Sequence, residues 1–198
     1  MIFDKIIPQG YADQIEADIN RTQFPWYYIH DVTNKSYGSN SGFVHVAIDF
    51  GKEPTEWYPF VKPIIYSIEE AMGHRVHQLL RIRVGLLTKN TEATYDYNTP
   101  HVDFLMPHVT ACYYVNDSDG DTILFDQTLQ DMNTTELSET TVLDYVKRTN
   151  FTIAQRCAPK KGRLFAFEGK QFHASSMPKQ HDRRIVITIN YIPEHYAP

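Results

Sequence analysis

The sequence predicts a mostly β domain with flanking helices, folded as a double-stranded β-helix of the jelly-roll type. Short β-prone runs separated by turn residues fill residues 78–192, whereas helical periodicity gathers in residues 1–77. A chain of 198 residues with 42% hydrophobic content suits one domain with a sizeable core. We therefore expect a single domain over residues 1–198, with N-terminal helices and a supporting strand in 1–77 and the jelly-roll core in 78–192.

The N-terminal part predicts two helices and one strand. Hydrophobic residues recur at helical spacing in residues 10–20 and 57–72, and they alternate as in a strand in residues 42–49. Pro63 is tolerable because it lies near the start of its helix. We expect the second helix to pack on the outer face of the sheet.

Two N-terminal segments could also serve a substrate. Trp26 lies in an aromatic run and could rim a substrate pocket, although packing on the core is the favoured interpretation. Residues 34–42 are rich in Ser, Gly and Asn, which predicts a mobile loop. Such a loop could close over a substrate or could simply connect two elements.

The jelly-roll core begins with residues 78–87, where apolar residues alternate with Arg81 and Arg83. This alternation predicts a half-exposed strand. Further strands are expected at residues 108–116, 122–125, 164–167, 171–174 and 184–191. The polar residues 127–150, which include one helical pattern, are expected to form an insertion over one edge of the barrel.

Composition narrows the partners and the compartment. The formal net charge of −5 and pI of about 6.0 leave no basic field for nucleic-acid phosphates, so a nucleic-acid partner is disfavoured. Cys112 and Cys157 lack metal or redox spacing and are expected to be reduced core thiols. The first residues lack a signal-peptide pattern and no apolar run reaches membrane length, so we expect a soluble cytoplasmic protein without a membrane partner.

Two histidines and one carboxylate are the candidate metal ligands. Because residues two apart on a strand share a face, His101 and Asp103 offer an imidazole and a carboxylate side by side. His173 can supply a second imidazole if its strand lies beside the first. Such a set leaves the opposite metal positions open, as in non-heme Fe(II) oxygenases. A hydrolytic zinc site with one bound water is the competing assignment.

These residues belong to a longer set of motifs in residues 81–192 that resembles the 2-oxoglutarate- and Fe(II)-dependent oxygenases, specifically their prolyl-4-hydroxylase-like branch, whose jelly roll is cupin-like. The matching residues are His-Val-Asp at 101–103, Ala-Cys-Tyr-Tyr-Val-Asn at 111–116, Gly-Asp-Thr-Ile-Leu-Phe at 120–125, Pro-Lys-Lys-Gly-Arg at 159–163, His173, and residues 184–191. The resemblance implies that His101, Asp103 and His173 bind Fe(II), and that 2-oxoglutarate and O2 are co-substrates.

The resemblance also implies a site for the distal carboxylate of 2-oxoglutarate. Arg184 would bind this carboxylate bidentately, which a zinc hydrolase does not require. Arg183 is the rival, but only Arg184 is in phase with the polar Thr188 and Asn190 along the strand. Thr188 would then line the co-substrate pocket, with Asn190 one step further along at the substrate rim. The resemblance places the Tyr114 hydroxyl on the same carboxylate.

The implied reaction is hydroxylation of an unactivated C–H bond with release of succinate and CO2, and ascorbate could support turnover. A prolyl or other residue of a peptide or protein is the favoured substrate. The alternatives are the same chemistry on a free small molecule or an alkylated nucleic-acid base, and a non-catalytic jelly-roll binding module. Tyr95 and Tyr97 precede the metal pair and could lie at the substrate entrance, or in an ordinary surface loop.

Overall fold

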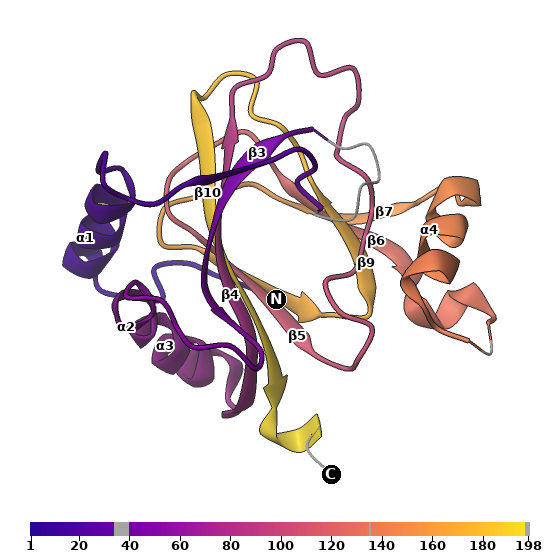
Figure 1. The fold of residues 1–198 in the computed structure, drawn as a ribbon, viewed down its shortest axis with the longest axis horizontal. Coiled ribbons are helices and arrows are strands. Elements are labelled where there is room, and N and C mark those ends of the chain that lie inside the picture. Colours follow the sequence, from indigo (N-terminus) through magenta and orange to yellow (C-terminus); the bar gives the residue numbers. More distant parts are fainter. Residues whose placement is uncertain (34–39, 135, 197–198) are drawn as a thin grey trace.

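The computed structural model describes residues 1–33, 40–134 and 136–196, and it contains two antiparallel sheets (Figure 1). The larger sheet contains, in spatial order, β1 (Ile2–Phe3), β8 (Leu164–Glu168), β5 (Val109–Tyr114), β10 (Arg183–Pro193), β4 (Val76–Thr88), β3 (Gly42–Asp49) and β2 (Tyr27–Ile29). The smaller sheet contains β7 (Ile153–Cys157), β6 (Thr122–Thr128) and β9 (Gln171–Ser175). This architecture confirms the predicted fold class, mostly β with flanking helices.

Helices cover the outside of both sheets (Figure 1). They are α1 (Gln9–Ile19), α2 (Tyr58–Val61) and α3 (Pro63–Met72) on one side, and α4 (Glu139–Arg148) on the other, with short 3-10 turns η1 (Leu129–Met132) and η2 (Glu194–Tyr196). The single helix expected over residues 57–72 is divided, because Pro63 has no N–H to donate and begins a new helix instead. None of the described helices is both long and apolar enough to cross a membrane.

The main hydrophobic core lies between the larger sheet and helices α1 to α3. Ile15 and Ile64 from the helices and Ile82 from β4 are fully buried there. Because side chains alternate along a strand, this packing turns Arg81 and Arg83 toward the inside of the barrel. The half-exposed strand predicted for residues 78–87 is therefore wrong: its second face borders an internal pocket.

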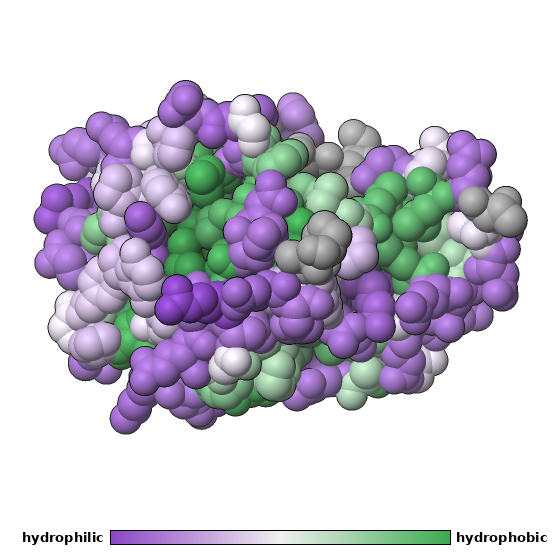
Figure 2. Space-filling model, turned by 90° about the horizontal axis from the view of Figure 1, so that it is seen from below, coloured by the Kyte–Doolittle hydropathy of each residue, from purple (hydrophilic) through white to green (hydrophobic). Residues whose placement is uncertain are grey.

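Three smaller hydrophobic clusters lie beside the main core in the described part of the chain, and the smallest consists of Val32, Leu87 and Met177. Of the other two, one lies between the two sheets and includes Tyr114, Phe165 and Leu124. The other lies under α4, so the polar insertion covers the smaller sheet. Strand β7, which follows the insertion and pairs with β6, was not predicted from the sequence. On the face seen in Figure 2, hydrophobic residues gather toward α4 and again nearer the N-terminal helices. Residues 34–39 of the predicted loop lie outside the described residues.

Candidate metal centre

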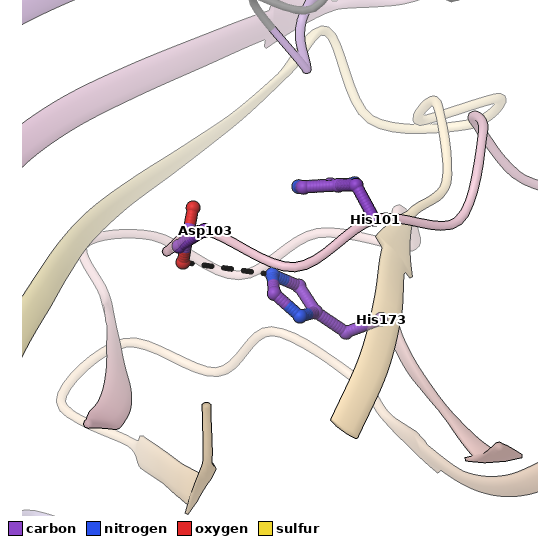
Figure 3. Close-up of side chains that lie close together, drawn as sticks. All are labelled: His101, Asp103 and His173. Carbon is purple, nitrogen blue, oxygen red and sulfur yellow. Dashed lines mark ion pairs between the residues drawn. The ribbon is translucent and has the colours of Figure 1, made fainter. Parts of the chain in front are cut away.

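The three candidate ligands meet at one point between the sheets (Figure 3). The backbones of His101 and His173 form a reciprocal pair of hydrogen bonds, each N–H donating to the other carbonyl at 2.9 Å. Asp103 follows His101 by two residues, and one ligand atom from each of the three side chains lies within 4.8 Å of the others. The structure thus brings together residues 72 positions apart in the chain, as the metal-site prediction requires.

Backbone carbonyls fix the orientation of both imidazoles. His101 Nδ1 lies 3.0 Å from the Thr99 carbonyl oxygen, and His173 Nδ1 lies 3.3 Å from that of Gln171. A proton on Nδ1, donated to the carbonyl, leaves the Nε2 lone pair available for a metal. His173 Nε2 lies 3.6 Å from the Asp103 carboxylate, across the shared space.

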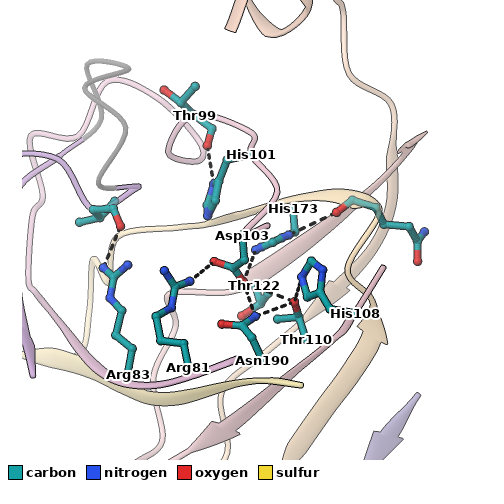
Figure 4. A network of polar contacts seen from close by, with 12 residues as sticks. Arg81, Arg83, Thr99, His101, Asp103, His108, Thr110, Thr122, His173 and Asn190 are labelled. Atoms are coloured by element: carbon teal, nitrogen blue, oxygen red, sulfur yellow. Dashed lines mark hydrogen bonds and ion pairs between the residues drawn. The ribbon is translucent and has the colours of Figure 1, made fainter. Parts of the chain in front are cut away.

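The Asp103 carboxylate is held by donors on both oxygens (Figure 4). Arg81 donates to Oδ1 at 2.7 Å, Asn190 donates to Oδ2 at 2.8 Å, and Thr110 donates to Oδ2 at 3.3 Å. Thr110 in turn contacts His108, a buried histidine that does not join the ligand set. Asn190 was expected at the substrate rim; it is instead fully buried and orients the carboxylate, because it pairs with Arg81 across β10 and β4.

Burial and charge set the protonation state of the three ligands. Burial, and then the neighbouring His173, lower the pKa of His101 to about 3. Burial also lowers the pKa of His173. For Asp103, burial opposes ionisation, but Arg81 and the two histidines hold its pKa well below the ordinary value. The site therefore offers two neutral imidazoles and a carboxylate at neutral pH, the state that binds a cation.

This protonation pattern predicts acid sensitivity of the metal-free protein. The ordinary pKa of His101 is 6.5 and its folded value is about 3, so the unfolded chain binds a proton that the folded chain excludes. Stability is therefore expected to fall as pH drops from about 6.5 toward 3. The check is urea unfolding at pH 7.5, 6.0 and 5.0 in the presence of a chelator. His101→Asn should flatten the dependence, and an identical slope in that variant would contradict the assignment.

A second buried group occupies the end of the same pocket. Arg184 is 4% exposed and donates to the Thr122 hydroxyl at 2.8 Å, and the Tyr114 hydroxyl donates to the same oxygen at 2.7 Å. The Arg184 Nε is buried without a hydrogen-bond partner in the described part of the chain. Thr188 lines this pocket, whereas Arg183 is exposed on the other face, as strand parity predicts. An orphaned guanidinium donor suits a carboxylate ligand.

Thr122 is a pocket residue that the sequence analysis did not single out. Its hydroxyl joins Arg184 and Tyr114, and it lines the pocket while Tyr114 stays behind it, in the core between the sheets. The only feature of the sequence that pointed to Thr122 was its position at the start of a predicted strand, which does not indicate a pocket residue. Its contact with Arg184 joins β6 of the smaller sheet to β10 of the larger sheet, and so depends on the packing of the two sheets.

Gly120 gives Arg184 its space. A Cβ at this position would lie 2.7 Å from the Ser176 carbonyl oxygen and 3.0 Å from Arg184 Cδ. We expect Gly120→Ala to lower the free energy of unfolding by about 1–3 kcal/mol and to weaken binding of any carboxylate at Arg184. Gly10→Ala is the control, because a Cβ there meets nothing within 4 Å. Equal thermal stability and 2-oxoglutarate affinity in the two variants would contradict this prediction.

The aromatic residues proposed for the substrate rim do not line the metal pocket. The ring centroids of Trp26 and Phe24 lie 4.7 Å apart, and Trp26 packs against the core beneath the N-terminal helices. It is therefore not at the entrance to the metal pocket. Tyr95 is 76% exposed, and the ring centroids of Tyr97 and Phe125 lie 5.1 Å apart. Both tyrosines line a separate cleft that runs toward α4. Tyr95 and Tyr97 were proposed as rim residues because they closely precede His101 in the sequence. Between them and His101 the chain turns away from the metal pocket, so both lie in the other cleft.

No protein-family model matches the sequence, and no curated protein matches it. Solved structures do. The non-heme α-ketoglutarate-dependent epimerase SnoN from nogalamycin biosynthesis is similar over 97% of this chain and 77% of its own, with 12% identity and a TM-score of 0.66. HygX from Streptomyces hygroscopicus, with nickel and 2-oxoglutarate bound, is similar over 98% and 82%, with 16% identity and a TM-score of 0.58.

A prolyl hydroxylase from Trichoplax adhaerens, in complex with a hypoxia inducible factor peptide fragment, is similar over 99% of this chain and 84% of its own, with 12% identity and a TM-score of 0.60. These likenesses establish the fold. At such identities they carry no residue assignment, so the roles of His101, Asp103, His173 and Arg184 stay predictions that rest on the geometry above.

Proposed function

We propose that this protein is a 2-oxoglutarate- and Fe(II)-dependent oxygenase. The observation that carries the proposal is one pocket that contains both the His101, Asp103 and His173 triad and the unpaired Arg184 donor. The triad would hold Fe(II), and Arg184 would bind the distal carboxylate of 2-oxoglutarate, with Thr122 and Thr188 beside it. The three similar structures support this, since their names state dependence on α-ketoglutarate, bound 2-oxoglutarate or prolyl hydroxylation.

The donor set suits iron chemistry. Two imidazoles and one carboxylate leave metal positions open for a chelating co-substrate and O2, and the bound iron would supply the activation of O2. The protein contributes the rest. Arg81, Asn190 and Thr110 keep the Asp103 carboxylate ionised and fixed, and the two sheets keep bulk water away from the ligands. A hydrolytic zinc site would have no use for the Arg184 donor.

The specific reaction that we propose is hydroxylation of an unactivated C–H bond. A prolyl or other residue of a peptide is the first candidate, because the motif set resembles prolyl hydroxylases and one similar structure holds a peptide. A small molecule is the second candidate, since SnoN belongs to nogalamycin biosynthesis. A binding module without turnover is the third, and the intact ligand set and Arg184 argue against it.

The test is succinate formation from 2-oxoglutarate with Fe(II), ascorbate and O2, measured by mass spectrometry. We expect turnover in the wild type, increased by the correct member of a panel of peptides and metabolites. His101→Ala and Arg184→Ala should each remove it. Turnover retained in both variants would eliminate this site assignment, and binding of neither Fe(II) nor 2-oxoglutarate would favour the binding module.

A further inference from the structure

Arg83 is a pocket residue to which neither the metal nor the co-substrate gives a role. It lies on β4 directly opposite Thr188 of β10, two residues from Arg81, and its side chain lines the metal pocket. In the described part of the chain, its one hydrogen bond goes to the Val32 carbonyl oxygen at 2.9 Å (Figure 4). A backbone carbonyl satisfies one donor only. The Asp103 carboxylate favours the Arg83 charge but is hydrogen-bonded by Arg81 and Asn190, so among the described residues Arg83 has no ion pair of its own.

The described residues that line the pocket carry more positive than negative charge. Among the described residues that line it, Arg81, Arg83 and Arg184 face a single carboxylate, that of Asp103, which gives an excess of two positive charges with the histidines neutral. A divalent metal and the dianion 2-oxoglutarate would cancel each other and leave this excess unchanged. Burial, and then Arg81, already lower the pKa of Arg83 to about 10. Another anion would relieve this repulsion.

Apolar side chains line the same pocket on the side of β4 that lies away from β10. They are Ile29 of β2, Phe43 of β3, and Val32, which lies in the segment that follows β2. Arg184 pairs with Leu87, four residues from Arg83, so the two arginines begin about 13 Å apart along the strand. Arg83 is therefore a cationic position separate from Arg184, and it lies along β4 between Arg81, which holds the Asp103 carboxylate, and the level of Arg184.

We propose that Arg83 binds a carboxylate of the substrate, whose apolar part lies against Ile29, Val32 and Phe43. The proposal rests on the proposed function and adds the substrate class to it: a carboxylic acid with an apolar body. The carboxylate belongs either to a free organic acid or to an acidic peptide residue. A guanidinium in an apolar pocket favours such a group because it offers paired donors and a full charge.

The experiment compares hexanoate with the uncharged hexanamide by calorimetric titration, in protein loaded anaerobically with Mn(II) and 2-oxoglutarate. We expect hexanoate to bind at least about tenfold more tightly than hexanamide. Arg83→Gln should abolish that preference, and Arg83→Lys should keep part of it because the charge remains. Arg148→Gln, at an exposed arginine of α4, is the matched control and should change nothing.

Two further comparisons identify the source and separate the proposals. Acetyl-Ala-Glu-Ala-amide against acetyl-Ala-Gln-Ala-amide reports whether a peptide carboxylate is accepted in place of the free acid. Loss of 2-oxoglutarate binding in Arg83→Gln, with retention in Arg184→Gln, would make Arg83 the co-substrate ligand and overturn the proposal. So would equal binding of hexanoate and hexanamide by the wild type.

Failure of the proposed function gives a different result. If wild-type protein binds neither Mn(II) nor 2-oxoglutarate, hexanoate is titrated into the metal-free protein, where the Arg83 charge is still present. Binding that is lost in Arg83→Gln and kept in Arg184→Gln would support the anion site alone. Binding unchanged in Arg83→Gln would overturn it.

Discussion

His173→Ala is expected to lower the affinity for a divalent metal by more than about 100-fold. Loss of a residue that only hydrogen-bonds to a metal ligand already lowers metal affinity by about 10- to 100-fold, and loss of a ligand itself should cost more. The change removes one of three donors and leaves the buried Asp103 carboxylate without its neighbouring imidazole. Equilibrium dialysis against Mn(II), with metal analysis of the protein, measures the effect. Loss of 2-oxoglutarate turnover should accompany loss of metal.

The matched control is His77→Ala, at an exposed histidine on β4. It should retain one metal per chain with wild-type affinity. Equal metal content in the two variants would show that His173 is not a ligand. Circular dichroism of both proteins distinguishes loss of a ligand from loss of the fold, since His173 also pairs its backbone with that of His101.

Arg184→Gln is expected to weaken 2-oxoglutarate binding by about 100-fold while the metal affinity stays within a factor of two. The variant would remove the proposed charge-assisted, bidentate interaction in a buried pocket, where each bond to a charged group contributes about 1.5–3 kcal/mol. Calorimetric titration of 2-oxoglutarate into Mn(II)-loaded protein gives the co-substrate affinity, and titration of Mn(II) into metal-free protein gives the metal affinity. Arg184→Lys should recover only part of the loss, because an ammonium lacks the planar pair of donors.

Arg183→Gln is the control for this prediction, since Arg183 is adjacent in sequence and exposed on the opposite face. It should bind 2-oxoglutarate like the wild type. A larger loss in Arg183→Gln than in Arg184→Gln would reverse the assignment that strand parity supports.

The sequence was sufficient where the deciding pattern is local. Strand parity separated the buried Arg184 from the exposed Arg183, because the two-residue period of a strand depends only on backbone geometry. His101 and Asp103 lie close together as expected, but not on a strand: His101 forms an isolated bridge with His173, and Asp103 lies in a bend. The strand around His173 was also predicted from its local pattern, and the family resemblance then implied that His173 joins His101 and Asp103 as a ligand.

The sequence was insufficient where a side chain depends on what lies across from it. The alternation around Arg81 and Arg83 indicates one polar face, but it cannot tell solvent from an internal pocket. Asn190 was placed at the rim for the same reason, although Arg81 across the sheet makes it a partner of Asp103. Thr122 acquires its role only when the two sheets pack together and its hydroxyl meets Arg184 of the larger sheet, which no local pattern encodes.

The distant aromatic residues show the other limit. Trp26 packs in the core and Tyr95 and Tyr97 line a cleft near α4, although all three were candidates for the substrate entrance. One wall of the metal pocket comes instead from Ile29 of the edge strand β2 and Phe43 of its neighbour β3. Proximity in sequence to a ligand motif therefore predicted proximity in space for the strand residues and not for the loop.

The most direct test of the central claim is the visible spectrum of anaerobic protein with Fe(II), recorded before and after 2-oxoglutarate is added, with His173→Ala as the control. We expect a charge-transfer band that appears only when wild-type protein, Fe(II) and 2-oxoglutarate are combined. Such a band requires the metal, the co-substrate and the ligand set to be assembled in one site. Absence of the band in wild-type protein with bound iron would contradict the proposed site and return the zinc and binding-module hypotheses.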